Sequence, residues 1–132
     1  MEIFNQWLLK AERDIDSAEL LLNGKLYDTA IYHTQQCAEK ALKGFLAFKR
    51  QPIQKTHDLV VLVKMCEKLD ADFDDISSQA YGLKGLDVEY RYPDDDDDLD
   101  YEINQPEESQ VKSSIMYARE ILDLVKEKCV VL

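Results

Sequence analysis

The stretch "YDTAIYHTQQCAEKALKGFLAFK", residues 27–49, predicts one long helix and with it an all-α fold. Apolar and small side chains recur here at steps of three and four residues, the repeat of a helix that buries one face. They are Ala30, Ile31, Thr34, Cys37, Ala38, Ala41, Leu42, Phe45 and Leu46. Small residues on this face would let a neighbouring helix approach closely. The helix is expected to end before Pro52, because proline and the residue before it resist helical geometry.

The segments around this helix carry the same repeat. Residues 3–23 form an amphipathic stripe that stops at Gly24, the expected C′ residue. A third helix is predicted after Thr56 as N-cap, with His57 and Asp58 in its first turn. A fourth is predicted from about Asp74 to Leu86, where its apolar stripe stops. Gly82 and Gly85 predict a kinked or frayed end, because glycine weakens a helix.

The last helix is predicted to begin near Pro106, as an N1 proline, and to run to about Lys128. Residues 91–105 are predicted to be a loop, since Pro93 and five consecutive aspartates oppose a helix. No repeat or flexible linker divides the chain. The sequence therefore predicts one domain, residues 1–132, folded as an antiparallel bundle of four to five helices.

Composition indicates a cytoplasmic protein. The three cysteines are odd in number and far apart, which favours a reducing compartment and buried thiols over disulfides or a metal site. The N-terminus lacks the basic region of a signal peptide, and no apolar run is long enough to span a membrane. Sequence motifs of ferritin-like di-iron sites, phosphate-binding loops and serine hydrolases are absent.

The net charge of −11 is concentrated in one part of the chain. Between Asp70 and Glu102 stand 13 acidic and 2 basic residues, and the remaining 14 acidic and 14 basic residues cancel. An acidic surface repels the backbone of nucleic acids and anionic lipids. Binding to DNA or to a membrane is therefore not expected.

The helix predicted over residues 27–49 also carries polar residues: Gln35, Gln36, Glu39, Lys40 and Lys43. Glu39 and Lys43 stand four residues apart in the order that favours an ion pair along a helix. One interpretation is a solvated helix face. The other is a set of polar residues that belongs to a site.

Four short motifs, in this order, resemble the HEPN family, named for nucleotide-binding domains of higher eukaryotes and prokaryotes. They are Trp7 to Leu22 on the first helix, "HTQQCAEKALKGFL" on the second, "KTHDL" at residues 55–59 and "YRYPD" at residues 90–94. Each motif is weakly specific alone, but the combination is specific. The resemblance covers about residues 3–128.

This resemblance implies a helical bundle that forms a homodimer. It also implies a partner, a minimal nucleotidyltransferase, with which such domains form two-component, toxin–antitoxin-like pairs. Many members are metal-independent ribonucleases with an R-x(4–6)-H motif near the later helices. In that motif the arginine holds phosphate and the histidine is the general acid or base.

The sequence departs from the ribonuclease motif. Its two histidines are His33 and His57, and none follows Arg91. A literal match runs from Arg50 to His57, but it lies directly after the second helix. The chain is therefore expected to be a non-catalytic member that binds a nucleotide or its partner protein. The alternative is a ribonuclease toxin that uses Arg91 and His57.

The stretch "EYRYPDDDDD", residues 89–98, completes the predicted site. Arginine fits a phosphate, and a tyrosine offers a ring for stacking. The predicted nucleotide-binding residues are His57, Arg91 and Tyr92, with Lys40 and Lys43 as further candidates. Alternatively, Arg91 anchors the loop through an ion pair and His57 packs locally.

The aspartate run at residues 94–98 has three interpretations: a solvated loop, ligands for Mg²⁺ or Ca²⁺, or a surface for a basic partner. Its spacing does not match an EF-hand, which needs a central glycine and a terminal glutamate. The prediction is therefore no metal site and no cofactor.

Overall fold

The computed structural model describes residues 2–91 and 105–130, and of Val88 and Arg91 only the backbone. The elements of this part are the α-helices α1 (Ile3–Asn23), α2 (Tyr27–Phe48), α3 (Leu59–Leu69), α4 (Ser77–Arg91) and α5 (Glu108–Lys128), and a 3₁₀ helix, η1 (Ala71–Ile76). The predicted all-α bundle is confirmed. In the residues described, no helix has the length and apolarity needed to cross a membrane.

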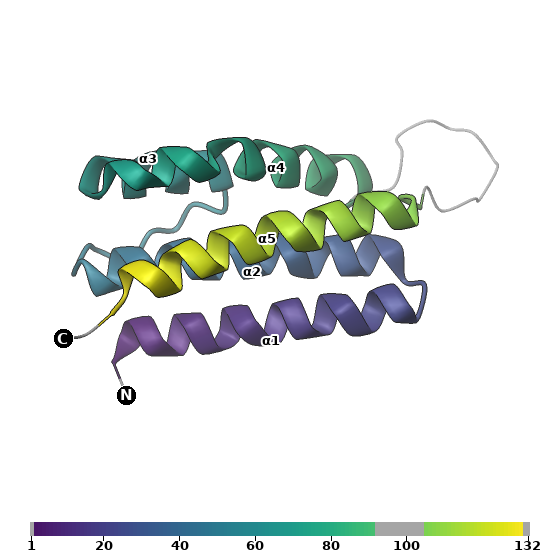
Figure 1. Cartoon of the computed structure of the whole chain (residues 1–132), viewed down its shortest axis with the longest axis horizontal. Coiled ribbons are helices and arrows are strands. Elements are labelled where there is room, and N and C mark those ends of the chain that lie inside the picture. Colours follow the sequence, from purple (N-terminus) through teal and green to yellow (C-terminus); the bar gives the residue numbers. More distant parts are fainter. Residues whose placement is uncertain (1, 92–104, 131–132) are drawn as a thin grey trace.

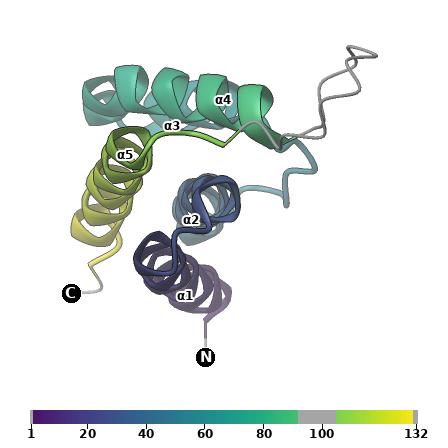
Figure 2. The same ribbon diagram turned by 90° about the vertical axis from the view of Figure 1, so that its right-hand side faces the viewer.

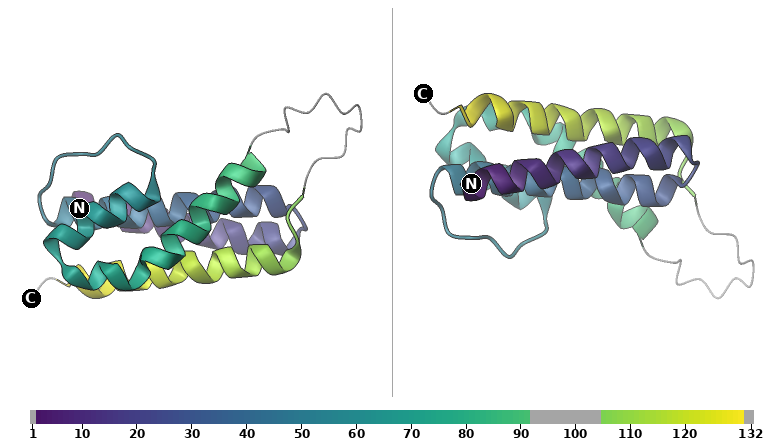
Figure 3. Two further views of the ribbon diagram at one scale, coloured as in Figure 1. Left: turned by 90° about the horizontal axis from the view of Figure 1, so that it is seen from above. Right: turned by 90° about the horizontal axis from the view of Figure 1, so that it is seen from below.

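Helix α2 lies at the centre of the bundle and contacts α1, α3, α4 and α5. Viewed end-on, α2 lies between α1 and the layer of α3 and α4, with α5 at its side (Figure 2). Helices α1 and α2 form an antiparallel hairpin, and α5 runs in the same direction as α2 (Figure 1). The connection between α2 and α3 arches out beside the bundle (Figure 3). One face of α2 is thus flanked by α1 on one side and by this connection on the other.

Small residues on α2 bring α1 close, as its sequence pattern predicts. A Cβ added to Gly44 would lie 3.2 Å from Cβ of Trp7 and 3.3 Å from Cδ2 of Leu8. A side chain at position 44 would therefore push the two helices apart. The largest fully buried side chains of the core are Phe45, Phe73, Ile31, Leu42, Leu59, Leu62, Leu83 and Ile121.

Helices α1 and α2 end in the same way. The residue after each C-cap has a positive φ, 60° at Lys25 and 57° at Arg50. The next N–H, of Leu26 and of Gln51, reaches back 2.9 Å to Leu21 O and Leu46 O respectively. Both ends are Schellman motifs with a non-glycine residue at C′. The prediction of Gly24 as C′ is wrong by one residue, because Gly24 is the C-cap with φ −82°.

Two predicted helix starts are corrected by their caps. Asp58, not Thr56, caps α3, because its side chain accepts hydrogen bonds from the N–H groups of Val60 and Val61. The Thr56 hydroxyl instead accepts the N–H of Asp58 at 3.1 Å. Helix α5 begins at Glu108 after Glu107 as N-cap, so Pro106 lies before the cap and not at N1.

The predicted fourth helix is also corrected at both ends. Its start is the 3₁₀ helix η1, whose Phe73 packs on Phe45 with ring centroids 4.3 Å apart. Its end lies at Arg91 and not at Leu86, and the helix continues through both glycines. Asp87 ended the apolar stripe in the sequence, but its position is buried, so the inward face continues past Leu86.

Candidate functional site

Three of the polar residues on α2 are buried. The exposed fractions of Gln35, Glu39 and Lys43 are 4%, 5% and 8%. The interpretation of this face as solvated is therefore wrong for these three residues. Gln36 and Lys40 are half-buried. Buried charges are stable only when they are paired, so the partners of Glu39 and Lys43 decide what this face does.

Glu39 joins a lysine of its own helix to a histidine of the α2–α3 connection. Its Oε2 accepts hydrogen bonds from Nζ of Lys43 at 3.2 Å and from Nδ1 of His57 at 3.0 Å. Gln35, one turn before Glu39, donates from Nε2 to the backbone oxygen of His57 at 3.5 Å. The side chain of His57 is nevertheless 75% exposed. Two buried side chains of α2 thus hold His57, Glu39 by its ring and Gln35 by its backbone oxygen, while the imidazole projects into solvent.

This pairing fixes the chemistry of the imidazole. A carboxylate only accepts hydrogen bonds, so Nδ1 of His57 carries the hydrogen and Nε2 is left for another partner. Neutral Nε2 accepts a hydrogen bond or a proton, and protonated Nε2 donates one to an anion. A carboxylate that orients a histidine in this way is a recurring element of acid–base sites.

Two buried oxygens beside His57 have no hydrogen-bond partner within the described chain: Oε1 of Gln35 and Oε1 of Glu39. Both belong to side chains whose other polar atom holds His57. An unsatisfied buried acceptor costs about 1 to 3 kcal/mol. A donor from outside the described chain, such as water or a bound molecule, would satisfy these two oxygens.

A second trio, again a carboxylate, a histidine and a lysine, joins α1 to α2. Asp14, 8% exposed, accepts Nδ1 of His33 at 2.9 Å through Oδ1 and Nζ of Lys40 at 2.6 Å through Oδ2. His33 and Lys40 are two helical turns apart on α2, so they hold Asp14 from both sides. Both histidines of the chain are thus held through Nδ1 by a buried carboxylate.

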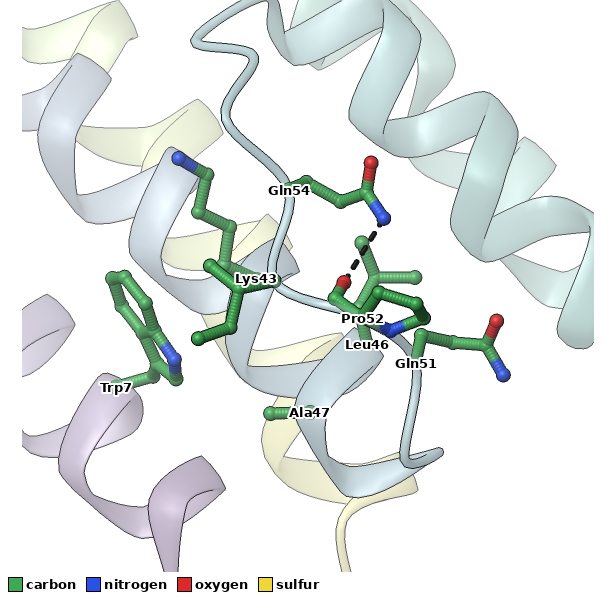
Figure 4. A pocket seen from close by; sticks show the side chains of 8 residues that line it. Trp7, Lys43, Leu46, Ala47, Gln51, Pro52 and Gln54 are labelled. Carbon is green, nitrogen blue, oxygen red and sulfur yellow. Dashed lines mark hydrogen bonds between the residues drawn. The ribbon is translucent and has the colours of Figure 1, made fainter.

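A small hollow separates Trp7 on α1 from the α2–α3 connection (Figure 4). It is lined by Trp7, Lys43, Leu46, Ala47, Gln51, Pro52, Ile53 and Gln54. The Lys43 ammonium lies 6.0 Å from the Trp7 ring centroid. The hollow has room for about one water molecule, so it is too small for a nucleobase.

Asp58, next to His57, ties the start of α3 to α4. Its Oδ2 accepts Nζ of Lys84 at 2.8 Å, and its Oδ1 caps α3. The hydrogen bond from Lys84, together with the two backbone N–H bonds, lowers the pKa of the Asp58 carboxyl below its ordinary value. The two neighbouring residues therefore contact different helices: His57 contacts α2, and Asp58 contacts α4.

The predicted meeting of His57 and Asp58 with Arg91 and Tyr92 is described only in part. His57 contacts α2, and Asp58 contacts α4 at Lys84, two turns before Arg91. Arg91 is the last residue of α4, while its side chain, Tyr92 and the aspartate run lie outside the described residues. Among the residues described, no cluster of three or more metal-ligating side chains is present.

The sequence model of the HEPN domain matches residues 4–128 of this chain. The chain belongs to the HEPN domain family.

Two solved structures agree with this assignment. ST0689, whose crystal structure is described as that of an archaeal HEPN homologue, is 31% identical. The alignment covers 98% of this chain and 100% of that chain, with a TM-score of 0.74. TT1696 from Thermus thermophilus is 26% identical over 97% of this chain and 99% of its own, with a TM-score of 0.80.

A shorter similarity links the chain to a protein of Methanocaldococcus jannaschii named "Putative toxin MJ1304". The two are 42% identical over 40 residues. This segment is 30% of the present chain and 26% of the relative, so the match spans about a quarter of the relative's length.

Sequence reasoning missed Asp14 and His33, and it gave Gln35 no role of its own. Asp14 stands among the apolar positions of α1, and a charged residue in such a stripe is a signal of a buried pair. His33 and Lys40 lie seven residues apart, which places them on one face of α2. Only the three-dimensional contact of α1 with α2 shows that they share Asp14.

Proposed function

We propose that this HEPN chain is one component of a two-component, toxin–antitoxin-like system and binds a nucleotide at the site around His57. Two findings support the toxin-like role: membership of the HEPN family and the partial similarity to a protein named as a toxin. The observation that carries the binding site is the exposed His57 imidazole, held by the buried Glu39 carboxylate at 3.0 Å.

The proposed site divides its work between positioning and contact. His57 offers Nε2 to a phosphate oxygen, and Glu39 already orients the ring through Nδ1, which lowers the cost of ordering it on binding. Arg91 supplies a guanidinium for phosphate, and Tyr92 a ring for stacking or a hydroxyl for a hydrogen bond.

The two lysine candidates differ in their access. Lys40, with a side chain 25% exposed, is paired with Asp14 at 2.6 Å, and binding an anion would require it to leave this partner. Lys43 is 8% exposed and donates to Glu39, so we assign it to positioning the carboxylate rather than to contacting the nucleotide.

Calorimetric titration with ATP and with GTP, each with and without Mg²⁺, tests the nucleotide-binding site. We expect micromolar binding by the wild type and loss of binding in His57→Ala and in Arg91→Ala. His33→Ala is the matched control, since it removes the other histidine held by a buried carboxylate. Absence of binding by the wild type at millimolar nucleotide would refute the site, as would equal loss in His33→Ala.

The partner proposal has its own test. We propose that the chain forms a homodimer and pairs with a minimal nucleotidyltransferase, as its family resemblance implies. Coexpression with a nucleotidyltransferase encoded beside it, followed by purification through a tag on one chain, should yield both proteins in fixed proportion. Sedimentation of the chain alone gives its oligomeric state. Separate elution of the two proteins would contradict the pairing.

A ribonuclease activity is the second candidate, and the orientation of His57 favours it. A histidine with a free Nε2 has the geometry of a general base for the 2′-hydroxyl of RNA. Incubation of the purified chain with RNA in the presence of a metal chelator should then give cleavage that is lost in His57→Ala and Arg91→Ala but kept in His33→Ala. Intact RNA after incubation with excess wild-type protein would exclude this activity.

A further inference from the structure

A groove runs between α4 and α5, and none of the proposed nucleotide-binding residues lines it. It is lined by Gly82, Leu86, Ser109, Gln110, Ser113 and Tyr117 and has a volume of about 330 Å³. Its lining mixes an aliphatic side chain, an aromatic ring, hydroxyls and a bare glycine. This composition suits a surface that receives part of another molecule.

The two glycines of α4 differ in what the chain itself requires of them. A Cβ added to Gly82 would lie 3.0 Å from Cε2 of Tyr117, so packing against α5 explains this glycine. A Cβ added to Gly85 would meet nothing within 4 Å in the chain as described. Glycine inside a helix costs about 1 kcal/mol relative to alanine. Packing inside the described chain therefore gives no reason for Gly85, and a close approach from outside would supply one.

Each helix also carries an exposed apolar side chain next in sequence to a residue that lines the groove. Tyr81 on α4 is 58% exposed and Met116 on α5 is 50% exposed. Tyr81 and Gly85 are four residues apart and so share the outer face of α4. Tyrosine and methionine are enriched where proteins bind other proteins. The face combines apolar anchors with a position where a helix backbone can come close.

The charges beside the groove select the partner. Glu89 on α4 and Glu108 and Glu120 on α5 are exposed, and Glu120 is held across the groove by Nε2 of Gln79 at 2.6 Å. Two cations of the described chain near this face are already paired: Lys112 lies 3.5 Å from Glu108, and Lys84, next to Gly85, donates to Asp58 at 2.8 Å. A second copy of this chain would bring the same exposed glutamates to the groove, so the proposed homodimer is expected to form through another face. A partner with basic side chains would be attracted to the exposed glutamates beside the groove.

We infer that the α4–α5 groove docks a basic amphipathic helix of a protein partner. Apolar residues of that helix pack on Leu86, Tyr117 and Met116, its backbone passes over Gly85, and its lysines or arginines face the glutamates. This inference rests on the proposal that the chain works with a protein partner. It concerns a surface separate from His57, so nucleotide titration and groove binding can fail independently.

Fluorescence anisotropy of labelled helical peptides tests the groove. The first peptide is a helix of about 20 residues, roughly 30 Å long, with leucines on one face and lysines elsewhere. The second has the same leucines with glutamates for lysines, and the third has the composition of the first in shuffled order. Each is titrated with the wild type, with Gly85→Trp, which blocks the groove, and with Asn5→Trp, a matched change at an exposed position of α1.

We expect micromolar binding of the first peptide, about tenfold weaker binding of the other two, and about a tenfold loss in Gly85→Trp but not in Asn5→Trp. Equal binding of the shuffled peptide would show charge attraction alone and overturn the inference. Unchanged binding of the first peptide by Gly85→Trp would also overturn it. The same holds if sedimentation shows that the wild type is a dimer and that Gly85→Trp breaks this dimer. In that last case a second copy occupies the groove. Circular dichroism of each variant confirms that it is folded.

Discussion

Nδ1 of His57 lies 3.0 Å from Oε2 of Glu39, and this contact joins an imidazole that is 75% exposed to a carboxylate that is 5% exposed. The two residues differ in what they contribute. Glu39 also neutralises the buried ammonium of Lys43, whereas His57 has most of its surface in water. The carboxylate therefore matters for folding, and the imidazole is available for function.

This asymmetry predicts that two substitutions destabilise the fold to very different extents. Glu39→Ala leaves Lys43 buried without its partner and should destabilise the fold by about 3 to 5 kcal/mol. His57→Ala removes an exposed ring and should cost less than about 1 kcal/mol. Urea denaturation followed by circular dichroism measures both. If Glu39→Ala does not fold, the double variant Glu39→Leu with Lys43→Met should recover stability, because it removes both charges together. Equal losses in Glu39→Ala and His57→Ala would contradict the prediction.

Lowering the pH should remove the contribution of Asp58 to the stability of the fold. Its pKa in the folded chain lies below the ordinary value of 3.8, chiefly because of the hydrogen bond from Lys84. A carboxyl with a lowered folded-state pKa contributes stability above its unfolded pKa, and this contribution is lost as the pH falls through the folded-state pKa.

The test compares the wild type with Asp58→Asn. Asparagine still caps α3 but loses the ion pair with Lys84, so the wild type should be more stable at neutral pH. Urea denaturation from neutral pH to about pH 3 should show this difference shrinking below about pH 4. A difference that stays constant with pH would show that the ion pair contributes nothing.

The three thiols should be inert in the folded chain. Cys37, Cys66 and Cys129 are free and buried, and burial raises the pKa of Cys37 and of Cys66 to about 12 and that of Cys129 to about 11. The thiolate is the reactive form, so iodoacetamide near pH 8 should modify none of them until urea unfolds the protein. Mass spectrometry of timed samples should find Cys129 modified first. Rapid alkylation of Cys37 in the native protein would contradict its burial.

The positive φ angles at Lys25 and Arg50 predict two stabilising substitutions. A non-glycine residue in the left-handed region costs about 1 kcal/mol, and glycine avoids this cost. Part of the gain is lost, because glycine also gives the unfolded chain more conformational freedom. Lys25→Gly and Arg50→Gly should therefore each raise stability by about 0.5 kcal/mol. Lys49→Gly, next to Arg50 but with φ −84°, should lower it. A stability gain in Lys49→Gly and none in Arg50→Gly would show that the left-handed residue is Lys49 and not Arg50.

The sequence predicted more of the fold than of the site, for physical reasons. A repeat of three and four residues is a local property, so all five helices could be predicted from neighbouring side chains. The Glu39–Lys43 spacing is the same on a solvated and on a buried face, and only the packing of the 49–58 connection over α2 decides between them. Asp14 meets Lys40 across 26 residues of chain, a contact that no local pattern contains.

Caps were missed for a related reason. Thr56 and Asp58 are both good N-cap residues two positions apart, and the choice depends on which side chain reaches the free N–H groups. Helix α4 was predicted too short because the buried Asp87 reads as the end of an apolar stripe.

The glycines of α4 give the last prediction, which separates packing from helix propensity. Gly85→Ala adds a methyl group where nothing lies within 4 Å and should stabilise the chain by up to about 1 kcal/mol. Gly82→Ala gains the same propensity, but its Cβ would lie 3.0 Å from Cε2 of Tyr117, so the ring must move and the gain should be cancelled or reversed. Urea denaturation of both variants, and of Gly82→Ala combined with Tyr117→Ala, measures this. The double variant should recover the propensity gain at position 82 relative to Tyr117→Ala alone. If instead Gly85→Ala destabilises and Gly82→Ala stabilises, the packing of α4 on α5 is not as described, and the α4–α5 groove loses its basis.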